Sequence, residues 1–280
     1  MSFGFEKELM KTHMDNVFEI KEQRPISPVG WLETSLPKTV MMRLRNYIET
    51  AKKDDAKTIK KDLAGNISKS LTIEDKDNWF FQSVLVPHVQ EFATRYPTFL
   101  SSAFVPEASS VPFRLSNLWV NFQKQYEFNP PHNHGGIWSF VVWVKIPTDF
   151  REQHALPFSA SSNMPKASDF EFQYTTMLGD ITGSNYALDK KSEGQMLFFP
   201  AKLLHSVYPF YECDKERVSI SGNIHFDTSE NIIAGKAKSE MEETRVVMGV
   251  CFGERDDFDN SAIQYHGKTK NYKKQQPEDD

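Results

Sequence analysis

The chain has 280 residues, of which 39% are hydrophobic and 25% are charged, and its formal net charge at pH 7 is -5. This length can bury one sizeable hydrophobic core, which favours one domain over several. The acidic balance gives no electrostatic reason to expect nucleic acid as a general partner. The two cysteines, Cys213 and Cys251, are too few for a disulfide framework and form no CxxC metal motif.

The sequence also predicts a protein without a membrane segment. Its longest apolar run, Ile137 to Val144, contains Ser139 and is too short to span a bilayer. Charged residues at Glu6, Lys7 and Glu8 interrupt the stretch that a signal peptide would need. We therefore expect a cytoplasmic protein.

The first 111 residues are predicted to form a helical support region. Pro37 stands where a first helical turn tolerates a missing N–H, and the helix that follows should end within residues 52–61. A second helix is expected from about Lys76 to Arg95, where Pro87 should kink it or divide it. Three- and four-residue spacing defines the apolar stripe of the first helix, which consists of Val40, Met41, Leu44, Tyr47 and Ile48.

From about Pro112 the hydrophobic period changes from helical to alternating, and aromatic and β-branched residues become frequent. Short strands separated by turn residues favour a jelly roll over a parallel sheet. We expect this core to span residues 112–253, with a long loop at 148–168 as a candidate lid and a disordered tail at 267–280. The expected strands are Phe113 to Phe122, Ile137 to Ile146, Asp169 to Leu178, Gln195 to Pro200, His205 to Tyr211, Arg217 to Phe226 and Arg245 to Phe252.

Alternation sorts the expected strand at residues 217–226 into a polar face and an apolar face. The polar face either lies in water or lines the interior of a barrel, and in the second case the amino-terminal helices cover the apolar face. An arginine inside a barrel needs an anionic partner, and its planar fork suits a carboxylate. The polar residues are Arg217, Ser219, Ser221, Asn223 and His225.

Histidines carry the strongest chemical signal. His132 and His134 lie one residue apart between Asn129-Pro130-Pro131 and Gly135-Gly136, so both rings point to one side of an extended backbone. Together with His205 they could occupy one face of a metal ion and leave other positions open for small ligands. For the pair, a polar turn that closes a hairpin remains the alternative. Surface or hydrogen-bonded roles are expected for His13, His88, His154 and His266.

Three blocks of sequence resemble a known family. They run from Trp119-Val120-Asn121 to His132-Asn133-His134, from Leu197-Phe198-Phe199-Pro200 to His205-Ser206-Val207, and over Arg217-Val218-Ser219-Ile220-Ser221. They resemble the Fe(II)- and 2-oxoglutarate-dependent oxygenases of marine bacteria and their phages, relatives of the prolyl hydroxylases. The resemblance covers about Leu115 to Phe226. It implies one oxygenase domain over residues 1–266, mainly β with amino-terminal helices, whose core is a double-stranded β-helix, a cupin-like jelly roll.

The resemblance also implies Fe(II) held by a His-x-Asp/Glu pair and a distal histidine, with 2-oxoglutarate as co-substrate and O2 as oxidant. Position by position, His132 matches the first metal ligand and His205 the distal one. Arg217 matches the arginine that binds the far carboxylate of 2-oxoglutarate. Ser219 matches an assisting hydroxyl, and Asn121 is similar to a second polar contact.

Two positions depart from what the resemblance implies. His134 stands where that family usually has a carboxylate, so either three imidazoles hold the iron or a water fills the position. We expect His134 to be a ligand. Tyr126 stands where the closer relatives tend to have glycine, a difference that would reshape a turn near the substrate entrance.

These residues predict a 2-oxoglutarate-dependent dioxygenase, a hydroxylase that releases succinate and CO2. The substrate, a small molecule or a peptidyl side chain, and the oligomeric state are left open, and for a phage-encoded protein the compartment would be the host cytoplasm. One alternative is a cupin-like metalloprotein that uses Zn, Ni or Mn without 2-oxoglutarate. Another is a non-catalytic binding module built on the same sheet.

Overall fold

The computed structural model describes residues 19–23, 29–53, 58–59, 65–100, 112–176 and 178–227, and only the backbone of residues 19–23. The strand expected at Arg245 to Phe252, the tail at 267–280, His13 and His266 lie outside these ranges. Within them, no helix is long and apolar enough to cross a membrane.

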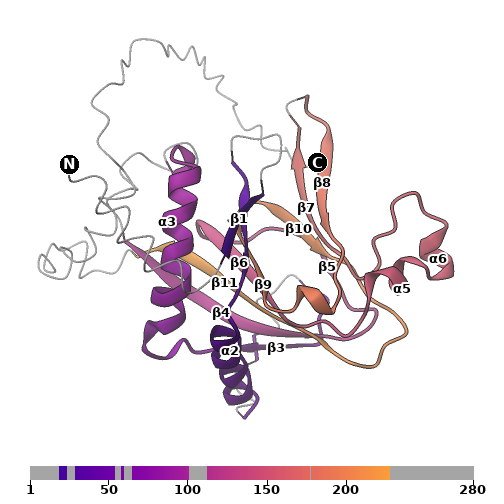
Figure 1. The fold of residues 1–280 in the computed structure, drawn as a ribbon, viewed down its shortest axis with the longest axis horizontal. Helices are drawn as coiled ribbons and strands as arrows, with labels where there is room; N and C mark the ends of the chain where they lie inside the picture. The colour runs from indigo at the N-terminus through magenta and orange to yellow at the C-terminus, as the bar shows by residue number, and fades with distance from the viewer. Residues whose placement is uncertain are drawn as a thin grey trace, which may run out of the picture.

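The described chain is mainly β, with two antiparallel sheets that face each other (Figure 1). The large sheet has the order β1-β2-β9-β6-β11-β4-β3, and the small sheet has the order β5-β10-β7-β8. Large-sheet strands are β1 (Glu19–Gln23), β2 (Trp31–Ser35), β3 (Lys69–Thr72), β4 (Phe113–Gln123), β6 (Trp138–Lys145), β9 (Gln195–Pro200) and β11 (Arg217–Phe226). Small-sheet strands are β5 (Asn129–His132), β7 (Phe170–Thr175), β8 (Ile181–Tyr186) and β10 (Leu204–Val207).

From β4 onward the chain passes back and forth between the sheets. Strands β4, β6, β9 and β11 belong to the large sheet, while β5, β7, β8 and β10 belong to the small one. This winding of one antiparallel ribbon into two facing four-strand layers is a double-stranded β-helix, a form of jelly roll. The fold expected from the sequence is therefore confirmed. Strands β1, β2 and β3 widen the large sheet at its two edges and had not been expected in a region predicted as helical.

Two helices cover the outer face of the large sheet, α2 (Lys38–Ala51) and α3 (Val86–Arg95) (Figure 1). The apolar stripe expected on the first helix is buried and packs in one core with the outward side chains of β6 and β11, among them Trp138 and Ile220. On α3, the ring of Phe92 lies 5.9 Å from that of Trp138 and 6.0 Å from that of Phe198. The helices thus bury one face of the sheet and leave its other face for the interior of the β-helix.

The second expected helix, predicted to be kinked or divided by Pro87, stays helical from residue 79 to residue 95 but changes from π to α geometry next to this proline. A 3-10 turn at Lys76–Asn78 and a π-helical turn at Phe81–Leu85 precede α3, which begins at Val86 with the proline in its first turn. Proline lacks the N–H that would bond to the preceding turn, and its ring displaces the carbonyl there, so the ladder widens locally.

The segment at 148–168, expected as a long loop and candidate lid, instead contains two short helices, α5 (Phe150–His154) and α6 (Pro157–Ala160). Asp149 caps α5 by accepting from the backbone N–H of Arg151 at 2.9 Å. Both helices project to the side of the β-helix in Figure 1, away from the helical face of the large sheet.

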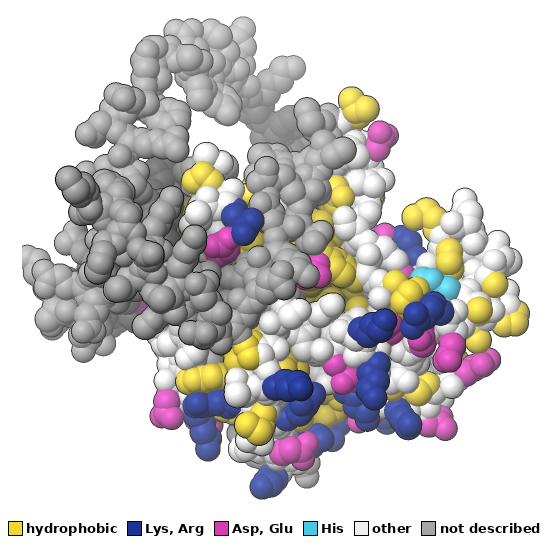
Figure 2. Space-filling view, in the orientation of Figure 1, with side chains coloured by type: hydrophobic (Ala, Val, Ile, Leu, Met, Phe, Trp, Pro, Cys, Tyr) yellow, Lys and Arg dark blue, Asp and Glu magenta, His cyan; other side chains and the backbone are white. Residues whose placement is uncertain are grey.

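On the visible face in Figure 2, Lys and Arg side chains are interspersed with Asp and Glu rather than forming a patch of one sign.

Candidate metal centre

The structure brings the three expected histidines together at one end of the space between the sheets. His132 ends β5, His134 follows in the next loop, and His205 pairs with His132 across neighbouring strands in the register of β10 and β5. One ring nitrogen from each residue lies within 4.8 Å of the other two, and Nε2 of His134 is 3.1 Å from Nε2 of His205. Two nitrogens each about 2.1 Å from one cation, at a right angle, would be about 3 Å apart. The observed spacing fits a shared metal ion.

Backbone carbonyls fix which nitrogen of each β-strand histidine faces the cavity. Nδ1 of His132 donates to the carbonyl of Pro130 at 2.8 Å, and Nδ1 of His205 donates to the carbonyl of Leu203 at 2.9 Å. A proton on Nδ1 leaves the lone pair on Nε2, which is the form that binds a metal. The backbone N–H of His134 donates to the carbonyl of Ala201 at 2.8 Å, which holds its loop against the β9–β10 connection.

The surroundings of the three rings favour their neutral form. Burial lowers the pKa of His205 well below its ordinary value, and it also lowers the pKa of His132. Burial, reinforced by the nearby His132, lowers the pKa of His134 to about 4. Metal binding requires neutral imidazole, so these ligands need lose no proton at pH 7.

Two glycines after His134 allow close packing of the loop on β11. Gly136 has φ +94, and a Cβ there would lie 2.6 Å from the carbonyl oxygen of Ile224 and 2.8 Å from Nε2 of His225. A Cβ on Gly135 would meet the His225 ring at 3.6 Å. Glycine supplies both the left-handed conformation and the space. The ring of His225 is thereby placed directly beside the histidine loop.

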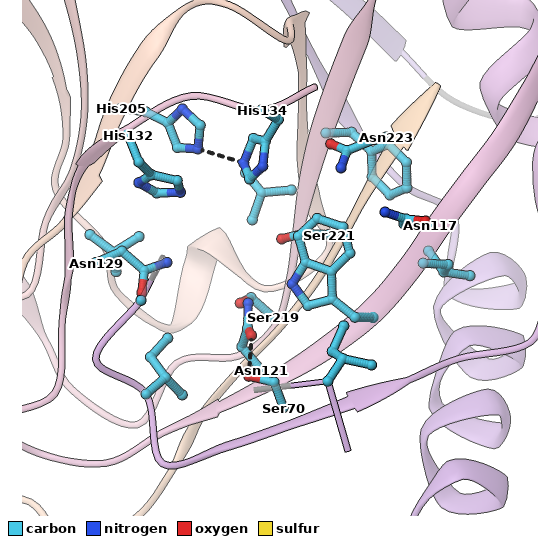
Figure 3. Close-up of a pocket in the computed structure, with 18 of the residues that line it drawn as sticks. Ser70, Asn117, Asn121, Asn129, His132, His134, His205, Ser219, Ser221 and Asn223 are labelled. Carbon is cyan, nitrogen blue, oxygen red and sulfur yellow. Dashed lines mark hydrogen bonds between the residues drawn. The ribbon is translucent and has the colours of Figure 1, made fainter. Parts of the chain in front are cut away.

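The three histidines line a cavity of about 520 Å³ between the sheets, a size that suits small ligands. The polar face of β11 lines this cavity. Of the two alternatives left open by the sequence, this face therefore lines the barrel interior rather than lying in bulk water. Trp119 and Asn121 of β4 line it as well, and the Trp119 ring lies 5.8 Å from that of His134. Figure 3 shows the imidazoles on one side of this space and Ser219 and Asn121 on another.

Arg217 is the buried cation of the cavity, with only 2% of its surface exposed. Its Nη2 donates to the carbonyl oxygen of Ser168 at 2.7 Å and also to that residue's hydroxyl. Its Nη1 lies 3.5 Å from Oε1 of Gln123, and its guanidinium carbon lies 5.2 Å from the centre of the Phe210 ring. Burial lowers the pKa of Arg217 to about 10, so it remains charged at pH 7.

The guanidinium retains unused binding capacity. Within the described ranges, Nε of Arg217 is buried with no hydrogen-bond partner, and no carboxylate lies within 4.0 Å of the group. The buried carboxylate of Asp169, next in sequence to Ser168, acts on it electrostatically but is itself bound by His154 at 2.9 Å and by Asn185. A buried guanidinium without a paired anion is a costly arrangement that a carboxylate ligand would relieve.

The amide of Asn121 is oriented by a neighbouring strand. Ser70 on β3 donates its hydroxyl to Oδ1 of Asn121 at 2.7 Å, and Asn121 pairs in register with Ser219 of β11. With its oxygen engaged, the amide has its Nδ2 hydrogens left to donate. Ser219 and Asn121, both expected at the co-substrate site, form the cross-strand pair two positions along the strands from Arg217 and Gln123, on the same face of the sheet.

Two residues that position the side chains of the cavity, Ser168 and Ser70, were not singled out from the sequence. Ser168 ends the segment that was predicted to be a loop, and Ser70 lies in the amino-terminal region, where no strand was predicted. Neither residue therefore belonged to a periodic pattern that could have marked it. His225 had been placed with Arg217 on the polar face by alternation and lines the cavity as that placement implies, but it had been given no role. Tyr126 has φ +69 and is 64% exposed, so the turn keeps the left-handed conformation that glycine favours.

Comparison with known proteins gives one match along the sequence. Residues 117–223 match the family described as "Putative 2OG-Fe(II) oxygenase". No curated protein sequence matches the chain.

Solved structures with a similar course of the chain include two prolyl hydroxylases. A Pseudomonas putida prolyl-4-hydroxylase is 11% identical, with 71% of this chain and 93% of that chain covered and a TM-score of 0.40. A Trichoplax adhaerens prolyl hydroxylase, in complex with a hypoxia inducible factor peptide fragment, is 11% identical, with 84% and 97% covered and a TM-score of 0.42.

Proposed function

Taking residues 117–223 as a 2OG-Fe(II) oxygenase by their family match, we propose that the protein is an Fe(II)- and 2-oxoglutarate-dependent dioxygenase that hydroxylates its substrate. The observation that carries this proposal is that one cavity holds both a convergent histidine triad and a buried guanidinium that forms no ion pair with a carboxylate of the described residues. A metal ion and a dicarboxylate are the ligands that these two groups would bind.

His132, His134 and His205 would hold the iron. The spacing and neutral state of the three rings, and the anchored tautomers of His132 and His205, suit a divalent first-row metal with open positions. When bound, iron and 2-oxoglutarate supply the activation of O2, with succinate and CO2 as co-products. The aromatic rings of Phe170 and Phe199 lie 5.7 Å and 5.0 Å from that of His205, and they restrict water on this side.

Arg217 would bind the far carboxylate of 2-oxoglutarate. Because Ser168 and Phe210 already fix the guanidinium plane, little side-chain freedom is lost when the carboxylate binds. The Ser219 hydroxyl and the Nδ2 group of Asn121, which line the same cavity, would donate further hydrogen bonds to the co-substrate. The protein's part is to orient the two ligands and to exclude water around them.

Metal identification together with succinate release separates this proposal from the cupin-like alternative. We expect the apo protein reconstituted with Fe(II) to convert 2-oxoglutarate to succinate in air, slowly without substrate, and the Zn(II)-reconstituted protein to produce none. Succinate formation that persists with Zn(II), or that is absent with Fe(II) in folded protein, would contradict the proposal. Retained zinc, nickel or manganese with no response to 2-oxoglutarate would favour a cupin-like metalloprotein. A folded protein with all three histidines intact that binds no metal would favour a binding module.

A further inference from the structure

The cavity has a second polar end, away from Arg217. Ser221, Asn223 and His225 continue the inward row of β11, and Asn117 of β4 is the register partner of Asn223. In Figure 3, Asn117, Ser221 and Asn223 border the same space as the imidazoles, on a different side from Ser219 and Asn121. The proposed co-substrate contacts do not use this end, which leaves it for the substrate.

Asn223 presents a donor to this end of the cavity. The buried hydroxyl of Ser139 donates to Oδ1 of Asn223 at 2.7 Å, and the Ser116 hydroxyl donates to the Asn223 carbonyl at 3.1 Å. Within the described residues, the Nδ2 group of Asn223 has no hydrogen-bond partner, although the residue is only 6% exposed. An amide held by its oxygen in this way is suited to a ligand that accepts hydrogen bonds.

Positive charge surrounds the same end. Arg114 pairs with His225 in the β4–β11 register, and Lys202 lies in the loop that joins β9 to β10. Burial lowers the pKa of His225, and the nearby charges of Arg114 and Lys202 lower it further. Arg114 is partly balanced by Asp227, whose Oδ1 is 4.0 Å from its Nε.

The histidine triad adds to this positive charge. Three neutral imidazoles leave a divalent cation with both of its charges, whereas a carboxylate at position 134 would cancel one of them. One carboxylate of 2-oxoglutarate at the metal leaves a single positive charge. This charge lies close to the second polar end, because the His225 ring packs against Gly135 and Gly136 directly after His134.

On the basis of the proposed function, we infer that the substrate carries a carboxylate, which the side chains of Asn117, Asn223 and His225 bind beside the metal. The anion supplies the acceptor that the Asn223 amide lacks. It also balances the charge that the histidine at position 134 leaves on the metal. The site thereby selects acids over neutral molecules of the same shape.

Titration calorimetry on the full chain tests this inference without turnover. The apo protein is titrated with Zn(II), then with 2-oxoglutarate, and then with N-acetyl derivatives of alanine, leucine, lysine and phenylalanine. Each derivative is supplied as the free acid and as the C-terminal amide, which differ in charge but hardly in shape. We expect acids to bind at least about tenfold more tightly than their amides, the scale of one charged hydrogen bond.

Asn223→Asp is the decisive variant. The Asp side chain can still accept from Ser139 while it replaces the cavity donor with a carboxylate oxygen, so the preference for acids should vanish. Asn117→Asp makes the same isosteric change at an exposed position and should reduce the preference even if the Asn223 variant fails to fold. Asn163→Asp, an exposed residue outside the cavity lining, is the matched control and should leave the preference unchanged.

The order of additions separates the two proposals. Failure of the wild type to bind Zn(II) or 2-oxoglutarate would overturn the proposed function and this inference with it. Binding of both, followed by equal affinity for acids and amides or by no binding of any acid, would overturn this inference alone. This inference would also be overturned if the preference for acids over amides were as strong in Asn223→Asp and in Asn117→Asp as in the control Asn163→Asp.

Discussion

Arg217 is held by Ser168 through two contacts, one to the backbone carbonyl and one to the hydroxyl, although 49 residues separate them in sequence. Ser168 is itself fully buried, has φ +74 and bonds through its hydroxyl to Thr148 at 2.9 Å. A non-glycine residue in this conformation is strained, and the surrounding contacts must maintain it. The carbonyl and hydroxyl of Ser168 thus orient the guanidinium through Nη2, while Nε has no hydrogen-bond partner among the described residues.

Loss of the Ser168 hydroxyl should weaken 2-oxoglutarate binding without weakening metal binding. We expect Ser168→Ala to lower co-substrate affinity about tenfold, because the guanidinium loses one contact that fixes its plane. Ser168→Gly also removes the hydroxyl but relieves the strained φ, so it should unfold with a free energy about 1 kcal/mol higher than the alanine variant. Calorimetric titrations and denaturant unfolding of both variants measure these effects. An unchanged co-substrate affinity in both would remove the positioning role.

His134 should be a direct metal ligand. His134→Ala leaves two imidazoles, and we expect at least about tenfold weaker Fe(II) binding in anaerobic titration. His134→Asp restores a ligand of the kind common in 2-His-1-carboxylate sites and should retain the metal. His154→Ala, which removes a histidine that binds Asp169 outside the cavity lining, is the control. Iron affinity in His134→Ala equal to that of the control would demote His134 to a neighbour of the site.

Gly136 should be less tolerant of a side chain than another glycine with the same backbone conformation. Gly136 and Gly179 have φ +94 and +88, but a Cβ at Gly136 collides with Ile224 and His225 while one at Gly179 meets nothing within 4 Å. Gly179→Ala should therefore cost only the conformational strain, about 1 kcal/mol. Gly136→Ala should cost clearly more and disturb the histidine loop. Equal losses in the free energy of unfolding would show that the packing of His225 on this loop contributes nothing.

His88 should make the stability of the apo protein depend on pH. It is fully buried on α3, with Nδ1 donating to the Val84 carbonyl at 2.7 Å and Nε2 lying 2.8 Å from the Thr34 hydroxyl. Burial lowers its pKa to about 4. The unfolded chain therefore binds a proton that the folded protein does not, and stability present above pH 6.5 is lost as the pH falls towards 4.

This contribution is on the order of 3 kcal/mol, since each unit of pKa difference corresponds to about 1.4 kcal/mol. Denaturant unfolding of the wild type and of His88→Gln between pH 4.5 and 7.5 measures it. We expect the variant to lose stability less steeply on acidification, although the histidine triad still contributes in the same direction. Parallel pH profiles for the two proteins would exclude His88 as a source of the dependence.

Much of the core could be predicted from the sequence because β11 and the second half of β4 alternate polar with apolar side chains, while β6 and β9 are short runs of mainly apolar and aromatic residues. The bounds of β9 and β11 agree with the expected ones. The short edge strands escaped prediction: β5 contains two prolines, and β8 has the burial pattern of a strand exposed on alternate residues. Such segments are strands because of their partners, not because of their own propensity.

The residues proposed to bind the metal and the co-substrate could be picked out from the sequence because each belongs to a strand or to a short motif next to one. Ser168 and Ser70 could not, since their roles arise from contacts between segments 49 and 51 residues apart. The segment expected to act as a lid contributes no residue to the cavity lining. Its last residue, Ser168, instead holds Arg217 by accepting a hydrogen bond from Nη2. Long-range contacts of this kind leave no periodic signal in a single sequence.

Anaerobic titration of the apo protein with Fe(II) and then 2-oxoglutarate, followed by visible absorption, tests the central claim most directly. We predict a metal-to-ligand charge-transfer band in the wild type. In Arg217→Ala the band should require more 2-oxoglutarate while the affinity for Fe(II) stays unchanged, because the guanidinium contacts the co-substrate and not the metal. No band in folded wild-type protein, or equal losses of metal and co-substrate binding in the variant, would contradict the account.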